Sequence, residues 1–267
     1  MVKRITVPQF QLFKERSEKL VLTTAYDVTF GRLADQSGVE GILVGDSLGM
    51  VVQGHSDTLP VTIEDVLYHT RCVSRGVERA HLIADMPFLS YQASVSIAVR
   101  NAGKLLQAGA QSVKLEGGSE ISETIYKLAH YGIPVMGHLG LTPQKIHQFG
   151  GFKIQARDEN SQKKILKDAK VLEEAGCYSL VLEAVPSMIA QLITQSVSIP
   201  TIGVGAGPYC DGQVLVIYDI LGFDKSFTPK FVKKYLNGDE ALTESLRSFV
   251  LDVKEHKFPA QENCFDL

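Results

Sequence analysis

The stretch Gly41-Ile42-Leu43-Val44-Gly45-Asp46-Ser47 joins an apolar run to a glycine, a carboxylate and a hydroxyl group. Short apolar runs of this kind are typical of buried strands. A carboxylate at the end of such a strand is costly to bury unless it is paired, hydrogen-bonded or bound to a metal ion. We therefore expect Asp46 to belong to an active site at the carboxyl end of a buried sheet.

The same pattern recurs along the chain and predicts the fold. Eight strands are expected, at residues 20–25, 41–46, 81–84, 112–116, 133–138, 179–183, 199–204 and 215–219. Most of them alternate with helical segments, which favours a parallel sheet, and eight such units suggest a closed (β/α)8 TIM barrel. Extra C-terminal helices are expected at residues 231–236 and 240–253. A doubly wound open sheet is the competing fold.

Length and composition agree with one barrel. The chain has 267 residues, close to the roughly 250 of a typical barrel, and 45% of them are apolar. No linker divides the sequence, so we predict a single domain over residues 1–267. The net charge of −3, without a basic block, argues against partners such as nucleic acid or an anionic membrane surface.

Other features bear on the location of the protein. No apolar run reaches the roughly 18 residues of a membrane span, and the first residues do not resemble a secretory signal. The four cysteines are scattered and form no CxxC pair, which disfavours a disulfide framework or a zinc site. We therefore expect a cytoplasmic protein without a membrane partner.

Polar side chains stand at the carboxyl ends of nearly all the predicted strands. They are Asp27, Asp46, Ser47, Asp85, Lys114, Glu116, His138, Glu183 and Asp219. Barrel enzymes place their chemistry at this face. Any single acid could instead be a helix cap or a turn residue. Caps do not require an acid on so many successive strands, so the set favours an active site.

Three of these acids predict a metal site. Asp46, Asp85 and Glu116 follow neighbouring strands, where they would repel one another and raise a pKa or recruit a cation. Oxygen ligands alone select a hard ion, and a few carboxylates suit Mg²⁺. Zinc is disfavoured because no His or Cys lies among them.

The remaining polar residues suggest roles around that ion. Lys114 is two residues from Glu116 and points to the same face, where it could neutralise the acids, bind a substrate carboxylate or, less readily, form a Schiff base. Glu183 suits a general base with a raised pKa, or a salt bridge to a neighbouring strand. His138 could donate to a substrate oxygen or be a satisfied core histidine.

Together these groups indicate enolate chemistry on an oxo acid. A 2-oxo acid can chelate Mg²⁺ through its keto oxygen and a carboxylate oxygen, and the ion then stabilises the enolate that forms when the base removes a proton. Two long segments, residues 48–60 and 139–157, have the length of lids. The chemistry of the residues leaves the electrophile open.

Longer motifs give the chain a resemblance. They are TTAYD at 23–27, LVGDSLGM at 43–50, QGH at 53–55, LPVT at 59–62, ADMPF at 84–88, VKLEGG at 113–118, GHLGLTPQ at 137–144, FGGFK at 149–153, LEAVP at 182–186 and IGVGAG at 202–207. With these motifs the chain closely resembles the ketopantoate hydroxymethyltransferase family over residues 20–231. Several of the motifs are too long to be chance matches.

The resemblance implies a specific reaction and assembly. A hydroxymethyl group would pass from 5,10-methylenetetrahydrofolate to 3-methyl-2-oxobutanoate through a Mg-stabilised enolate, giving 2-dehydropantoate in pantothenate (coenzyme A) biosynthesis. It implies a homo-oligomer, often a decamer. It assigns Mg²⁺ to Asp46, Asp85 and Glu116, the oxo acid to Asp46, Ser47, Asp85, Lys114 and His138, and proton removal to Glu183.

Two alternatives compete with this assignment. A Mg-dependent C–C lyase or mutase of the phosphoenolpyruvate mutase and isocitrate lyase type would normally need a reactive cysteine in a catalytic loop. The loops after strands two to five contain none except Cys72, which lies in a helical pattern. A non-catalytic barrel that serves as a scaffold predicts losses among the rim acids, and none is seen.

Overall fold

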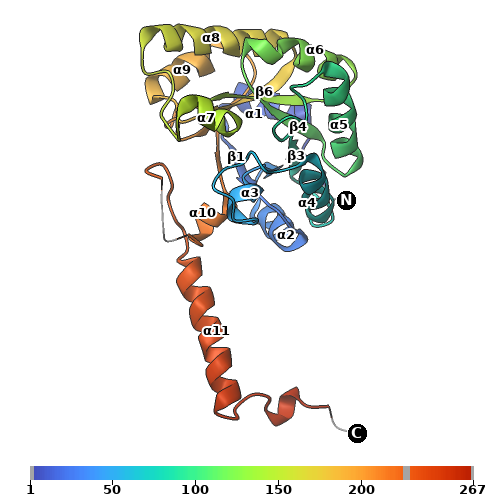
Figure 1. Ribbon diagram of the computed structural model, residues 1–267, viewed down its shortest axis with the longest axis vertical. Coiled ribbons are helices and arrows are strands. Elements are labelled where there is room, and N and C mark those ends of the chain that lie inside the picture. Colours follow the sequence, from blue (N-terminus) through green and yellow to red (C-terminus); the bar gives the residue numbers. More distant parts are fainter. Residues whose placement is uncertain (1–2, 225–228, 266–267) are drawn as a thin grey trace. The chain divides into compact units, whose positions relative to one another are not determined.

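Eight parallel strands close into a barrel in which each strand pairs with the next along the chain and β8 pairs with β1 (Figure 1). The structure, a computed structural model, describes residues 3–224 and 229–265. The strands are β1 Leu20–Thr24, β2 Gly41–Val44, β3 His81–Asp85, β4 Ser112–Glu116, β5 Val135–Gly140, β6 Cys177–Glu183, β7 Thr201–Val204 and β8 Gly212–Leu215. The predicted TIM barrel is therefore confirmed, and the closed sheet excludes the doubly wound alternative.

The predicted position of the eighth strand is wrong. The last strand, β8, ends at Leu215, and residues 217–219 belong to the short helix α10 Ile217–Leu221. Gly212 opens β8 because a side chain there would place its Cβ 2.4 Å from the carbonyl oxygen of Leu20 on β1. An apolar-run search does not detect a strand that begins with glycine and glutamine. Asp219 consequently lies on α10 and not at the end of a strand.

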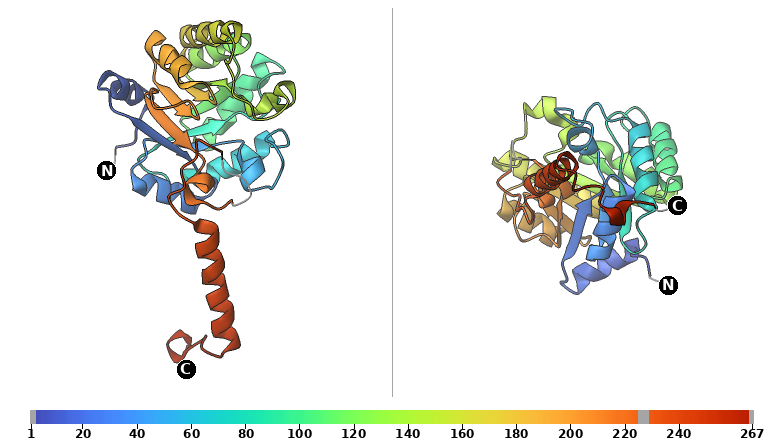
Figure 2. Two further views of the ribbon diagram at one scale, coloured as in Figure 1. Left: turned by 90° about the vertical axis from the view of Figure 1, so that its left-hand side faces the viewer. Right: turned by 90° about the horizontal axis from the view of Figure 1, so that it is seen from below.

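Helices surround the strands in the order expected of βα units, as the two further views show (Figure 2). They are α1 Val7–Glu15, α2 Val28–Ser37, α3 Leu48–Val51, α4 Ile63–Ser74, α5 Val95–Gln107, α6 Ser122–His130, α7 Ile146–Phe149, α8 Glu159–Glu174 and α9 Ser187–Ser196, with 3-10 turns η1 Ser119–Ile121 and η2 Pro143–Lys145. The two long loops thus carry short helices of their own.

Side-chain caps explain where several helices begin. Asp27 Oδ1 accepts a hydrogen bond of 2.9 Å from the backbone N–H of Phe30, and Thr62 and Asp158 cap α4 and α8 in the same way. Such caps satisfy backbone donors that the first turn of a helix leaves unpaired. Asp27, one of the predicted rim acids, is therefore the N-cap of α2.

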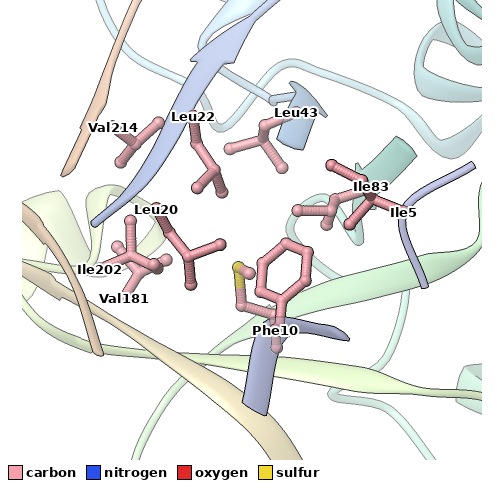
Figure 3. Packing of buried hydrophobic residues seen from close by; sticks show 10 residues of the cluster. Ile5, Phe10, Leu20, Leu22, Leu43, Ile83, Val181, Ile202 and Val214 are labelled. Carbon is pink, nitrogen blue, oxygen red and sulfur yellow. The ribbon is translucent and has the colours of Figure 1, made fainter. Parts of the chain in front are cut away.

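The apolar core fills the amino-terminal half of the barrel and leaves the other end to polar side chains. The cluster takes side chains from seven strands, all except β4, and they meet Ile5 and Phe10, which precede β1 (Figure 3). Phe10 is fully buried, and its ring packs edge-on against His81 and Tyr178 with centroids 5.2 and 5.5 Å away. Helix α1 thus closes the bottom of the barrel.

The described residues up to Val216 form one compact unit and those from Ile217 onward form a second. The single domain over residues 1–267 stays a prediction. The second unit contains α10, α11 Gly238–Lys254 and the 3-10 turn η3 Gln261–Asn263. Residues 231–236 are not helical, contrary to expectation, and the Tyr235 N–H donates to Ile220 O at 2.8 Å instead. In the described part of the chain, no helix is long and apolar enough to cross a membrane.

Candidate active site at the carboxyl ends of the strands

Five of the predicted site residues lie together at the carboxyl ends of β2 to β5. Asp46, Asp85, Lys114, Glu116 and His138 are each at most 4% exposed. In the sheet register, Asp85 is the partner of Lys114 and Glu116 is the partner of His138. Residues paired across neighbouring strands place their side chains next to each other. The topology therefore assembles this charged cluster in the same order in which the residues follow along the chain.

Lys114 lies at the centre of the cluster. Its Nζ is 2.7 Å from Asp85 Oδ1, 3.7 Å from Glu116 Oε1 and 3.2 Å from His138 Nδ1. Burial alone would lower the pKa of Lys114, but the negative charges of Asp85, Glu116 and Asp46 outweigh it and raise the pKa. Lys114 is thus a cation, which disfavours the Schiff-base alternative because a protonated amine is not a nucleophile.

The acids of the cluster repel one another. Burial raises the pKa of Asp46 well above its ordinary value, and the charges of Asp85 and Glu116 raise it further. Burial likewise raises the pKa of Asp85, against the opposing effect of Lys114. Glu116 differs, since hydrogen bonding to His138 and the charge of Lys114 outweigh burial and lower its pKa. These carboxylates favour an additional cation beside them.

The hydrogen bonding of the cluster agrees with this charge pattern. Asp85 Oδ1, Glu116 Oε1 and His138 Nε2 are buried, and each contacts an oppositely charged side chain of the site, at 2.7, 3.4 and 3.2 Å. The donor set of Asp46, Asp85 and Glu116, all oxygen, fits a hard cation such as Mg²⁺.

The acidic side chains of the cluster are not arranged around a common point, as the ligands of one ion would be. Over residues 3–224 and 229–265, no group of three or more His, Cys, Asp or Glu side chains is arranged closely enough to hold a metal. The ammonium of Lys114 binds Asp85 instead, at 2.7 Å. A metal at this site would therefore require the Lys114–Asp85 pair to rearrange.

Glu183 ends β6 and faces the cluster through His138. Its Oε2 lies 3.2 Å from His138 Nε2, so the salt bridge to a neighbouring strand is present. The Glu183 side chain is 20% exposed, compared with 3% for that of His138. Gly140, with a positive φ of 96°, lets β5 approach this residue, because a Cβ there would lie 2.2 Å from Glu183 O. Glu183 is thus both fixed in position and partly open to solvent.

His138 lies between two carboxylates. Its Nδ1 is 3.4 Å from Glu116 Oε1, on the side of the ring opposite Glu183. Burial and the charge of Lys114 lower the pKa of His138, but hydrogen bonding to Glu116 and Glu183 outweighs them and raises the pKa to about 9. His138 is therefore buried among partners and also part of the site.

Ser47 lies beside Asp46 and is half-buried. Its Oγ is 2.8 Å from the hydroxyl of Tyr26, which follows β1. Gly45 is needed for this approach, because a Cβ there would lie 2.7 Å from Ser47 Oγ and 3.3 Å from Asp85 Oδ2. The turn after β2 therefore places both Ser47 and Asp46 at the rim, and Tyr26 is a contact that the sequence did not predict.

Two further residues of the site were not predicted, Tyr91 and Gln144. Gln144 Nε2 donates to Asp46 Oδ2 at 2.9 Å, and its backbone N–H donates to Glu116 Oε2 at 3.0 Å. The Tyr91 hydroxyl lies 2.9 Å from both Glu116 O and Gln144 Oε1. Neither side chain is charged, Gln144 lies in the 3-10 turn η2 of the loop after β5, and Tyr91 lies in the loop after β3, so neither strand ends nor charge patterns point to them. The motif GHLGLTPQ was the only available signal, since it ends at Gln144.

A separate cavity of about 340 Å³ lies at the carboxyl ends of β4 and β5, beside α8. Its lining includes Gly118, Phe149, Lys145 and Lys164, and the two lysines pair with Glu120 and Asp168 at 2.5 Å. Of the residues predicted for the site, none is among those lining residues. The charged cluster, and not this cavity, is the candidate active site.

Comparisons with known proteins agree with the fold and the motifs. The chain is 53% identical to a 3-methyl-2-oxobutanoate hydroxymethyltransferase of Syntrophus aciditrophicus, over 98% of this chain and 97% of that one. It is 52% identical to the enzyme of that name from Clostridium novyi, over 98% and 96%. A phosphonopyruvate hydrolase crystallised with oxalate and Mg²⁺ shares the fold, with a TM-score of 0.62 and 13% identity over 97% of this chain and 93% of that one. The profile described as ketopantoate hydroxymethyltransferase matches residues 4–261, and the chain belongs to that family.

Proposed function

We propose that this enzyme, a 3-methyl-2-oxobutanoate hydroxymethyltransferase by family, takes its one-carbon unit from 5,10-methylenetetrahydrofolate and forms 2-dehydropantoate through an enolate. The step belongs to the biosynthesis of pantothenate and thus of coenzyme A. One observation carries the proposal: a partly exposed carboxylate, Glu183, contacts the same histidine that contacts the buried acid Glu116, at 3.2 and 3.4 Å. This contact supports a role for Glu183 as a base beside the groups that would bind an oxo acid.

The reaction balances with one water molecule. The C–H bond at C3 of the oxo acid breaks, and its electron pair forms a bond to the methylene carbon of the folate. Both C–N bonds between that carbon and the folate break. Water supplies the new hydroxyl group, and the proton from C3 and one proton of water end on the two folate nitrogens.

Asp46, Asp85 and Glu116 would hold Mg²⁺. The raised pKa values of Asp46 and Asp85, caused first by burial, support a cation here. When bound, Mg²⁺ would supply a Lewis acid that polarises the keto oxygen and makes the neighbouring C–H more acidic. A protein of similar fold was crystallised with Mg²⁺ and oxalate, which is compatible with this assignment.

The protein groups divide the remaining work. Glu183 would remove the proton from C3, since its side chain is 20% exposed whereas Asp46, Asp85 and Glu116 are buried. His138 would hold the Glu183 carboxylate in place. Lys114 would bind the carboxylate of the oxo acid, with Ser47 as a hydrogen-bond donor beside it.

The test follows the product directly. The protein is incubated with 3-methyl-2-oxobutanoate, Mg²⁺ and 5,10-methylenetetrahydrofolate, and 2-dehydropantoate is measured by chromatography. We expect Glu183→Gln to lower turnover about 10²- to 10⁴-fold, the usual contribution of a general base. Glu174→Gln is the matched control, because Glu174 is exposed on α8. An absence of product, or turnover by Glu183→Gln equal to that of the unmodified chain, would contradict the proposal.

The proposal also covers the location and the assembly of the protein. We expect a cytoplasmic enzyme that acts as a homo-oligomer, which the resemblance implies is a decamer. Size-exclusion chromatography with light scattering measures the mass directly against the 29.3 kDa of one chain. A monomer at micromolar concentration would contradict this part without affecting the chemistry.

A further inference from the structure

We propose that Gln144 is a positioning residue that fixes the orientation of the Asp46 and Glu116 carboxylates for metal binding, and that Tyr91 holds the Gln144 amide in its required orientation. This inference rests on the proposed function, because it assumes that these two acids bind the metal ion. It assigns a role to a loop residue that follows β5, while the acids that it contacts follow or end β2 and β4.

The Gln144 amide uses all of its hydrogen-bonding capacity. Its Nε2 donates to Asp46 Oδ2 at 2.9 Å and to the carbonyl oxygen of Met86 at 3.0 Å. Its Oε1 lies 2.9 Å from the Tyr91 hydroxyl and accepts from Gln92 Nε2 at 3.1 Å. An amide has two N–H donors and one oxygen with two lone pairs, so no capacity is left over.

This arrangement permits only one orientation of the amide. Turning it by 180° would bring Gln144 Oε1 against Asp46 Oδ2 and the Met86 carbonyl oxygen. The carbonyl oxygen can only accept hydrogen bonds, and so can the carboxylate of Asp46 when it is ionised. It would also leave Nε2 facing the donor Gln92. Because Gln144 is only 6% exposed, water is not available to repair either mismatch.

Gln144 joins two acids that are separated in the sheet. Strands β2 and β4 are two strand spacings apart, roughly 10 Å at the backbone. The Gln144 side chain reaches Asp46 after β2, while its backbone N–H donates to Glu116 Oε2 on β4 at 3.0 Å. Both carboxylates therefore have one oxygen held by the same residue. The other oxygen of Glu116, Oε1, faces Lys114 and His138 at 3.7 and 3.4 Å, whereas Gln144 holds Asp46 through Oδ2 alone.

Tyr91 fixes the other end of the arrangement. Its hydroxyl accepts from the Glu116 N–H at 3.2 Å and lies 2.9 Å from both Glu116 O and Gln144 Oε1. The side chain is 2% exposed, so water does not replace these contacts. Tyr91 therefore links the backbone of one acid to the amide that orients the other.

The neutrality of the amide matters at this position. A lysine in place of Gln144 would neutralise Asp46 and compete with a metal ion for it. An amide donates to the ionised carboxylate without adding charge, and so holds one oxygen while leaving the negative charge for the metal. Groups that hold a ligand from behind in this way commonly contribute 10- to 100-fold to metal affinity.

The test measures metal binding without substrate. Mn²⁺ serves as the probe, and its free concentration is read from its electron paramagnetic resonance signal. We expect Gln144→Met, which keeps the length of the side chain but removes the amide, to raise the Kd for Mn²⁺ about 10- to 100-fold. Tyr91→Phe should weaken binding in the same direction, and the double variant should lose less than the sum of the two effects because they act through one contact.

Controls separate this role from a general loss of structure. Gln148→Met, an exposed position on α7, should bind Mn²⁺ like the unmodified chain, and circular dichroism should show Gln144→Met folded at the assay temperature. If Gln144→Met does not fold, Tyr91→Phe decides, and unchanged Mn²⁺ binding by it overturns the inference.

The outcomes distinguish the inference from the proposed function. If the unmodified chain binds Mn²⁺, Asp46→Asn abolishes binding and Gln144→Met binds as tightly as the unmodified chain, only the inference is overturned. If the unmodified chain binds no Mn²⁺, the metal site and the inference both fail. Weaker binding by Gln144→Met, with Gln148→Met unchanged, supports both.

Discussion

His138 Nε2 lies 3.2 Å from Glu183 Oε2, across the boundary between β5 and β6. The other nitrogen of the ring lies 3.4 Å from Glu116 Oε1. One imidazole thus connects the proposed base to a proposed metal ligand, and the hydrogen bonding of both acids keeps its pKa at about 9 despite burial. A charged ring at this position pairs with the Glu183 carboxylate and holds it in place.

Removing this ring should slow the reaction without abolishing it. We expect His138→Gln to lower kcat about 10- to 100-fold, because Glu183 loses the partner that orients it but keeps its own carboxylate. Steady-state kinetics on purified protein measures the change. His130→Gln is the control, since His130 is exposed on α6. A kcat of His138→Gln equal to that of the control would show that the ring is only a core residue.

The two roles considered for Lys114 predict different kinetics. If Lys114 binds the carboxylate of the oxo acid, Lys114→Met should raise KM for 3-methyl-2-oxobutanoate about 10- to 100-fold, the usual effect of a lost charge-assisted hydrogen bond. If it only neutralises the acids, its loss should tighten metal binding and leave KM unchanged. We expect the increase in KM. An unchanged KM at saturating Mg²⁺ would remove Lys114 from the substrate site.

Activity should require a divalent cation. Dialysis against a chelator should lower turnover at least about 100-fold, and adding Mg²⁺ should restore it, because three buried acids would otherwise repel one another and the substrate. Asp46→Asn should not be restored at the same Mg²⁺ concentration. Full activity of the chelator-treated protein, with metal content checked by mass spectrometry, would contradict a metal role.

His81 should make stability depend on pH at the other end of the barrel. Burial lowers the pKa of His81 to about 4, compared with about 6.5 in the unfolded chain. Between these pH values, the unfolded chain therefore binds a proton that the folded chain does not bind. The stability contributed by the neutral ring is complete above pH 6.5 and is lost as the pH falls toward 4. Between pH 7 and 5, the loss should be about 2 kcal/mol.

Urea denaturation at pH 7 and pH 5 measures this effect. From pH 7 to pH 5, we expect the unfolding free energy of His81→Gln to fall by about 2 kcal/mol less than that of the unmodified chain. The exposed His147→Gln should behave like the unmodified chain. The same drop in His81→Gln as in the control would mean that another group titrates in this range.

The sequence predicted the barrel and the charged rim because both follow from strand ends. Asp46, Asp85, Lys114, Glu116 and His138 end or follow apolar runs, and the parallel topology brings such positions together. The same rule also included Asp27, which caps α2, and Asp219, which lies on α10. A strand-end rule alone does not separate a cap from a ligand.

What the sequence missed depends on tertiary contacts of neutral groups. Gln144 reaches Asp46 from a loop 98 positions away in the chain, and Tyr91 reaches Glu116 across 25. Neither distance follows from periodicity or charge. β8 was misplaced for a related reason, since Gly212 is selected by its approach to Leu20 and not by an apolar pattern.

The most direct test of the account is proton exchange at C3 of 3-methyl-2-oxobutanoate in D₂O, followed by proton NMR without folate. The account predicts Mg²⁺-dependent exchange catalysed by the unmodified chain, and a rate reduced about 10²- to 10⁴-fold in Glu183→Gln but not in Glu174→Gln. Exchange that persists in Glu183→Gln, or that does not occur in the unmodified chain with Mg²⁺, would contradict proton removal by Glu183.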